Sequence, residues 1–102
     1  MDKIILHHQG AYNVYCTIAD GPIFEWACTL HQIRLFIEKQ YGEVALSQLP
    51  KRLERAHGKG TSSIWDKSLE DTIDGNRAGP GESMLTLDEF IAKFLTLPVT
   101  NV

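Results

Sequence analysis

Two short stretches near the start of the chain are rich in residues that favour β-strands, and the second of them alternates its faces with a period of two. They are residues 3–8 (KIILHH) and residues 12–18 (YNVYCTI), separated by the turn-prone connector QGA. Alternate residues of the second stretch share a face, as in a half-buried strand. The spacing predicts an antiparallel hairpin. After a turn signal at residues 20–22 (DGP), residues 23–26 (IFEW) predict a third short strand.

Helical spacing replaces this alternation from Thr29 onward. Thr29 and Gln32 form the T-x-x-Q pattern of a capping box, and apolar residues then recur every three or four positions until Gly42. This pattern predicts a helix that ends at Gly42. A second capping box, Thr86 to Glu89 in the sequence LTLDEFIAKFL, predicts the last helix of the chain.

The middle of the chain predicts shorter helical pieces. One is expected over residues 44–49, and Pro50 is expected in the first turn of the next, which runs over residues 51–57 and ends at Gly58. Residues 63–66 (SIWD) repeat the cap pattern with a shorter acid and predict the start of a further helix.

The order of these elements, strands first and helices after, predicts an α+β fold. We expect a small antiparallel sheet, built from the N-terminal hairpin with room for a third strand, that packs one face against three to five α-helices. A length of 102 residues with 43% hydrophobic residues suits one compact domain over residues 1–102. Residues 98–102, which follow the last helix, are expected to be a flexible tail.

The chain shows no signal for membrane insertion or secretion. No apolar run approaches the roughly 20 residues needed to span a bilayer. The first ten residues, MDKIILHHQG, have an acid at position 2 and no small-residue cleavage site. We therefore expect a cytoplasmic protein that does not contact a membrane.

The twelve-residue stretch DTIDGNRAGPGE, from Asp71 to Glu82, begins and ends on a carboxylate like a calcium-binding EF-hand loop. That loop also needs oxygen ligands at positions 3 and 5 and glycine at position 6. Here Ile73, Gly75 and Asn76 occupy those positions, so too few oxygens remain for calcium. The histidine spacings H-x-x-x-H and H-E-x-x-H do not occur either. We expect no metal and no cofactor.

One enzymatic alternative stays open at this point. His57, with Lys59 and Ser62, has the residue types of a small RNase-like hydrolase that pairs a histidine base with an acid. A capping histidine at a helix end, beside a solvated loop, is the favoured explanation of His57. Cys16 and Cys28 lack the C-x-x-C spacing and are expected to be reduced core thiols. We therefore predict no catalytic residue.

The net charge of −3 is unevenly distributed. Residues 51–60 carry four cations against one acid, whereas residues 66–93 carry seven acids against three cations. The basic segment suggests a second alternative, a nucleic-acid-binding regulator, although one short basic helix face is usually only solvated. The cations concerned are Lys51, Arg52, Arg55 and Lys59.

The acids gather around a connector that is long for a small helical domain. Residues 74–85 separate two predicted helices, where two to eight residues are usual, and unusually long loops are often functional. A local negative field steers a basic partner and discriminates against wrong ones. We therefore predict a partner-binding surface here. Its residues are Glu70, Asp71, Asp74, Asn76, Arg77 and Glu82.

With its acidic connector and its terminal helix LTLDEFIAKFL, the chain resembles the small bacterial immunity proteins of contact-dependent growth-inhibition systems. The resemblance spans the whole chain and rests on size, fold class and acid placement. It implies a non-enzymatic protein that binds and neutralises a cognate toxin domain, often a basic nuclease, by stoichiometric contact. The resemblance assigns a functional role to no individual residue. The broad apolar face and two tryptophans also leave room for a structural subunit or a homodimer.

Overall fold

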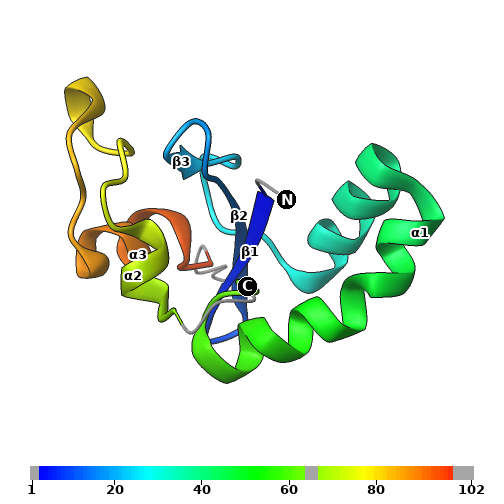
Figure 1. The fold of residues 1–102 in the computed structure, drawn as a ribbon. Coiled ribbons are helices and arrows are strands. Elements are labelled where there is room, and N and C mark those ends of the chain that lie inside the picture. Colours follow the sequence, from blue (N-terminus) through cyan, green and yellow to red (C-terminus); the bar gives the residue numbers. More distant parts are fainter. Residues whose placement is uncertain (1–2, 64–66, 98–102) are drawn as a thin grey trace, which may run out of the picture.

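The computed structural model describes residues 3–63 and 67–97. The expected tail at 98–102 lies outside these residues. Three antiparallel strands in the order β1-β2-β3 form one sheet, which confirms the α+β class. Figure 1 shows α1 on one side of the hairpin and α2 and α3 on the other. The elements are β1 (Lys3–His8), β2 (Ala11–Cys16), β3 (Gly21–Pro22), α1 (Leu30–Lys59), α2 (Leu69–Ile73), the 3-10 turn η1 (Pro80–Glu82) and α3 (Leu87–Phe94).

The predicted hairpin is present, with a tight turn between its strands. His8 pairs with Ala11, so the turn has two residues, Gln9 and Gly10, with φ values of 47° and 80°. Two consecutive positive φ values are typical of the type I′ turn, whose twist matches that of the strands. The third strand is also present, but residues 21–22 form it and not residues 23–26, which bend away.

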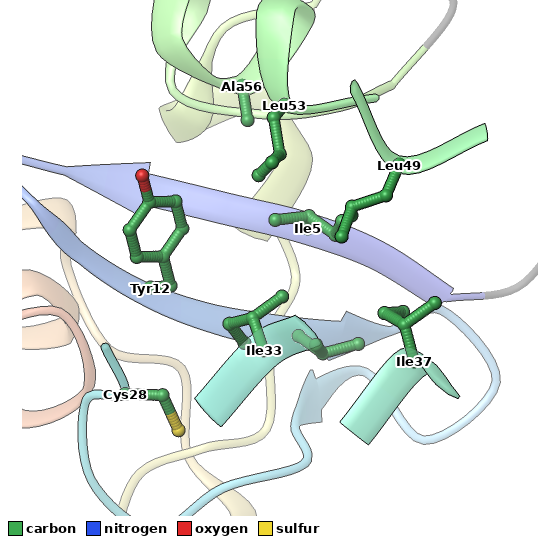
Figure 2. Close-up of a cluster of buried hydrophobic side chains, with 9 residues drawn as sticks. Ile5, Tyr12, Cys28, Ile33, Ile37, Leu49, Leu53 and Ala56 are labelled. Atoms are coloured by element: carbon green, nitrogen blue, oxygen red, sulfur yellow. The ribbon is translucent and has the colours of Figure 1, made fainter. Parts of the chain in front are cut away.

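Helical elements cover both faces of the sheet, so the expectation that helices pack on only one face is wrong. Ile5 and Tyr12 face α1, whereas Leu6 and Tyr15 face α2, the connector and α3. Five of the six residues of β2 are buried. The physical reason is that both faces of β2 carry side chains that are apolar or have their polar atoms hydrogen-bonded inside the protein, so both can be covered. Figure 2 shows the cluster on the α1 side. The α1-side cluster is Ile5, Tyr12, Val14, Cys28, Ile33, Ile37, Leu49, Leu53 and Ala56. The connector-side cluster is Leu6, Tyr15, Leu69, Ile73, Leu85, Phe90, Phe94 and Leu95.

A buried asparagine explains how a polar residue fits in the central strand. Asn13 in β2 is fully buried, and its side-chain nitrogen donates to the carbonyls of Phe24 and Phe94, each at 3.1 Å. Its oxygen accepts from the N–H groups of Val14 and Phe24. Because every polar atom of the amide is paired, burial carries no unsatisfied group. Asn13 thereby ties β2 to the chain that follows β3 and to the end of α3.

Helix α1 has two arms that meet at an elbow. Gly42 has φ 81° and ψ −168°, which confirms the predicted helix stop there. The first arm is residues 30–41 and the second arm is residues 43–59; in Figure 1 they diverge from the elbow at the upper right. The second arm runs through Pro50 and ends at Gly60, which has φ 85°. The predicted break before Pro50 and the stop at Gly58 are therefore wrong.

Proline removes only one helical hydrogen bond, and the buried face of the second arm continues across it. Leu49, Leu53 and Ala56 lie on that face at helical spacing and pack on the sheet (Figure 2). Among the described residues, 3–63 and 67–97, no helix combines the length and the apolar content needed to cross a membrane.

The outer edge of β1 is covered by the chain that leaves α1. The His7 N–H donates to the Gly60 carbonyl at 3.0 Å, and the Ser62 N–H donates to the Ile5 carbonyl at 2.8 Å. The Ser62 hydroxyl also accepts from the Ile5 N–H at 2.9 Å. Pairing of this kind blocks edge-to-edge association of sheets.

Both predicted capping boxes are confirmed. Thr29 caps α1 and Thr86 caps α3, each with its hydroxyl and the side chain three residues later bonded reciprocally. Helix α2 begins at Leu69, and Ser68 and Asp71 form a third capping box at its N-terminus. The predicted cap at residues 63–66 falls partly outside the described residues, and Ser63 itself is not helical.

Candidate functional site

A hollow of about 430 Å³ opens between α2 and the chain that leads into α3. Its wall carries three exposed carboxylates, those of Glu70, Asp71 and Asp74, and one exposed apolar side chain, Met84, with 55% of its surface accessible. Half of the six predicted partner-binding residues therefore meet in one place. The full lining is Glu70, Asp71, Ile73, Asp74, Met84, Leu85, Thr86 and Leu87.

Helix α2 is held rigidly although it has only five residues. The Ser68 hydroxyl accepts from the Asp71 N–H at 3.1 Å, and the Asp71 carboxylate accepts from the Ser68 N–H at 3.2 Å. On the inner side, Leu69 and Ile73 are buried, and the Thr72 hydroxyl donates to the Ser68 carbonyl at 2.9 Å. The acids of the hollow consequently project from a fixed turn of helix.

Asn76 does not contact solvent, so it is removed from the predicted partner surface. Its side chain is 1% exposed. Its amide nitrogen donates to the carbonyls of Ile73 at 2.8 Å and Leu85 at 3.0 Å, and its amide oxygen accepts from the N–H groups of Ala78 and Leu85. Both ends of the connector are thus joined through one amide. Sequence alone suggested a loop-tip contact because asparagine is common at exposed turns.

Arg77 and Glu82 are exposed, as predicted, but they do not line the hollow. The Arg77 N–H donates to the Asp20 carbonyl at 2.7 Å, which ties the connector to the turn between β2 and β3. Glu82 lies in η1, and the Gly79 N–H donates to the Ser83 carbonyl at 2.8 Å across that turn. Figure 1 shows this gold turn at the far end of the connector from α2.

Tyr15 lies buried beneath the connector. Tyr15 is 2% exposed, and within the described part of the chain its hydroxyl has no hydrogen-bond partner. Burial raises the pKa of Tyr15 to about 12, and the nearby charges of Asp20, Cys16 and Asp74 add to the increase. The phenol of Tyr15 is therefore held in its protonated form.

Met84 is the feature of this site that sequence reasoning missed. It follows a polar stretch and precedes Leu85, which is buried. A lone apolar residue beside a core residue is not informative in sequence, because either one can be the buried member of the pair. Methionine is flexible and polarisable, and suits surfaces that bind another protein.

The structure separates Ser62 from the group proposed for an RNase-like reaction. Ser62 is buried against β1, and its hydroxyl is turned into the sheet edge. His57 instead meets Tyr12 and His7: the Tyr12 hydroxyl lies 2.6 Å from His57 Nε2, and the His7 and His57 ring centroids are 4.7 Å apart. Ser62 is thus not available to His57, whose neighbours include aromatic groups of the hairpin.

The hairpin histidine is held as a neutral group. His7 Nε2 accepts from the Gly10 N–H at 3.0 Å, which an imidazolium cannot do. Burial lowers the pKa of His7, and the neighbouring His57 and His8 lower it further. Burial also raises the pKa of Tyr12, so its phenol stays protonated. These contacts pack the turn of the hairpin against the end of α1.

Two of the four cations in the basic segment donate hydrogen bonds to backbone carbonyls of this chain. Arg52 is buried and donates to the Lys3 carbonyl at 2.9 Å, and burial lowers its pKa. Arg55 donates through Nε to the Ser62 carbonyl at 2.9 Å. Guanidinium groups committed to backbone carbonyls are less available to phosphates, so this helix face offers a weak nucleic-acid surface.

The two thiols are free, and they differ in setting. Cys28 is buried, and burial raises its pKa, as expected of a core thiol. Cys16 is only half-buried at the end of β2, and hydrogen bonds from the backbone at Ala19 lower its pKa. The prediction of two core thiols therefore holds for Cys28 alone.

The chain was compared with protein-family models, with curated proteins and with solved structures. None of these comparisons gave a significant match. Within residues 3–63 and 67–97, no three histidine, cysteine or acidic side chains are grouped as metal ligands. A function for this chain is accordingly inferred from its own surfaces.

Proposed function

We propose that this chain is a non-enzymatic inhibitor that binds a basic protein through the hollow between α2 and the connector. The proposed partner is a bacterial toxin domain, most simply a nuclease, neutralised in the cytoplasm by stoichiometric contact. The single observation that carries the proposal is the grouping of Glu70, Asp71 and Asp74 around exposed Met84 in one hollow.

The chemistry of this grouping favours a lysine or arginine side chain of the partner. Such a side chain has an aliphatic stem, which packs on Met84, and a cationic head, which Glu70 and Asp74 attract. A nuclease needs cations to hold the phosphates of its substrate. A protein that occupies those cations competes with the nucleic acid directly.

The order of the connector supports the same proposal. Asn76 joins its two ends with four hydrogen bonds, and Ser68 with Asp71 fixes α2. A surface that is already ordered loses little conformational entropy on binding, so more of the contact energy appears as affinity. Flexible loops of similar length lack this advantage.

A charge-reversal pair tests the surface. Glu70→Lys with Asp74→Lys changes the hollow and leaves Asp71 to cap α2, whereas Glu25→Lys with Glu54→Lys makes the same change in net charge at exposed acids outside the hollow lining. Immobilised wild-type and control proteins are expected to retain the same basic protein from host lysate at low salt. The hollow variant is expected to lose it. Equal retention by all three proteins would exclude the hollow as the binding surface.

A second measurement separates inhibition from binding. The retained protein is incubated with RNA and with DNA in the presence of increasing amounts of this chain. The proposal predicts cleavage that stops near one equivalent of wild type and continues with the hollow variant. Binding without any effect on activity would leave a binding module and contradict the inhibitor role.

A further inference from the structure

The two arms of α1 enclose an apolar groove of about 390 Å³ that is separate from the acidic hollow. Figure 1 shows the arms diverging on the side of the sheet away from α2 and α3. Each arm contributes four of the residues that line the groove. The lining is His31, Arg34, Leu35, Glu38, Leu46, Leu49, Pro50 and Leu53.

The first arm exposes a leucine where a solvated helix normally carries a polar residue. Ile33 and Ile37 are buried on the face that packs on the sheet (Figure 2). Leu35 lies two residues from each, about 200° around the helix, so it points away from the sheet. It is 52% exposed. Arg34 and Glu38 flank it and are also exposed.

The charges on this face are self-complementary when two first arms lie antiparallel. If the two-fold axis passes near residue 36, Arg34 of each copy faces Glu38 of the other, and the two Leu35 side chains meet beside the axis. A two-fold interface uses the same patch twice, so one residue pair supplies two ion pairs. Parallel arms would instead place like charges together.

We propose that this chain forms a two-fold dimer through the first arms of α1, with each arm lying along the groove of the other copy. The apolar lining of the groove and Leu35 supply the buried centre, and the pairs Arg34 to Glu38 supply the rim and the register. The acidic hollow lies on the opposite side of the sheet and stays open in both copies. The dimer is independent of the proposed inhibitor function.

Charge-reversed variants test the register as well as the association. Light scattering during gel filtration is expected to report a concentration-dependent dimer for wild type. Arg34→Glu and Glu38→Arg each create two like-charge pairs, so each variant alone is expected to dimerise about tenfold more weakly or worse. An equimolar mixture of the two restores both ion pairs and is expected to recover the dimer as a heterodimer.

A fourth protein controls for the change in net charge that Glu38→Arg makes. Glu25→Lys changes an exposed acid outside α1 and is expected to dimerise like wild type. Circular dichroism checks that the surface variants remain folded. The proposal is overturned by a monomeric wild type at every accessible concentration, by single variants that dimerise as well as wild type, or by a mixture that associates no better than its components.

Discussion

The two sides of the sheet are stabilised in different ways. On the α1 side, two long arms bury a cluster that is mostly aliphatic, including Ile33 and Ile37. On the connector side, helices of five and eight residues frame a long irregular segment, and buried amides such as Asn13 and Asn76 hold the chain together. Apolar burial is non-directional, whereas hydrogen bonds fix geometry.

This difference bears on function. A surface of irregular backbone keeps a defined shape only if its polar groups are paired internally, and Asn76 provides that pairing for the chain beside the hollow. The α1 side anchors the fold, and the connector side presents charged groups at fixed positions. Substitutions on the two sides should therefore differ in character, and the following experiments compare them.

The largest effect is expected on the apolar side. Ile37→Ala removes a side chain that is 1% exposed between the first arm and the sheet and should lower the free energy of unfolding by about 2–5 kcal/mol. Urea denaturation measures the change. Leu35→Ala on the same arm is the control and should stay within about 0.5 kcal/mol in dilute, monomeric protein. Equal losses for the two variants would contradict the assigned faces of the arm.

On the connector side, Asn76→Ala should cost about 3 kcal/mol, because it leaves the Leu85 carbonyl and the N–H groups of Ala78 and Leu85, all buried or half-buried, without their side-chain partner. Ser83→Ala, which removes one exposed hydroxyl bond to the Pro80 carbonyl, should cost less than about 1 kcal/mol. Similar urea midpoints for Asn76→Ala and wild type would show that the amide network does not hold the connector.

Replacing glycine with alanine should change the free energy of unfolding in opposite directions on the two sides of the sheet. At Gly79 an added Cβ would lie 2.5 Å from the Ser83 hydroxyl and 2.8 Å from its carbonyl oxygen, so Gly79→Ala should destabilise by about 1–3 kcal/mol. At Gly58, within the second arm, a Cβ meets nothing within 4 Å, and Gly58→Ala should stabilise by about 0.5–1 kcal/mol. Thermal melts of both variants test the contrast, and shifts of the same sign would refute it.

The smallest effect concerns pH and the turn of the hairpin. The pKa of His7 is lowered from its ordinary value of 6.5 in the folded state, so the unfolded chain binds the proton more readily. Stability should therefore fall as pH drops from 6.5 toward the lower folded pKa, where His7 charges and loses its bond from Gly10. His7→Gln should reduce this loss in unfolding titrations. An unchanged pH profile would assign the loss to other groups.

The sequence predicted the local elements well and the long-range contacts poorly. The hairpin, the caps at Thr29 and Thr86 and the stop at Gly42 follow from turn and capping chemistry that acts within four residues. The continuation through Pro50 depends instead on packing against the sheet, which overrides a local signal. The packing of α2, the connector and α3 on the second face of the sheet likewise depends on long-range contacts.

For the candidate site, the acids of α2 were predictable because they precede the long connector, whereas the burial of Asn76 was not. Its amide is paired with Leu85, nine residues away, and such a pair leaves no periodic signal. The grouping of Met84 with Glu70 and Asp74 likewise depends on how the connector folds back. Such folding back is set by tertiary contacts, which leave no local pattern in the sequence.

The central claim is that the connector is ordered before any partner binds. Hydrogen exchange of the free protein tests this claim at the Ala78 and Leu85 amides, which both donate to the Asn76 side-chain oxygen. We predict that exchange at these amides is slowed about a hundredfold or more in wild type, and that Asn76→Ala removes this protection while the Val14 amide stays protected. Exchange of both connector amides at unprotected rates in the wild-type protein would contradict the claim.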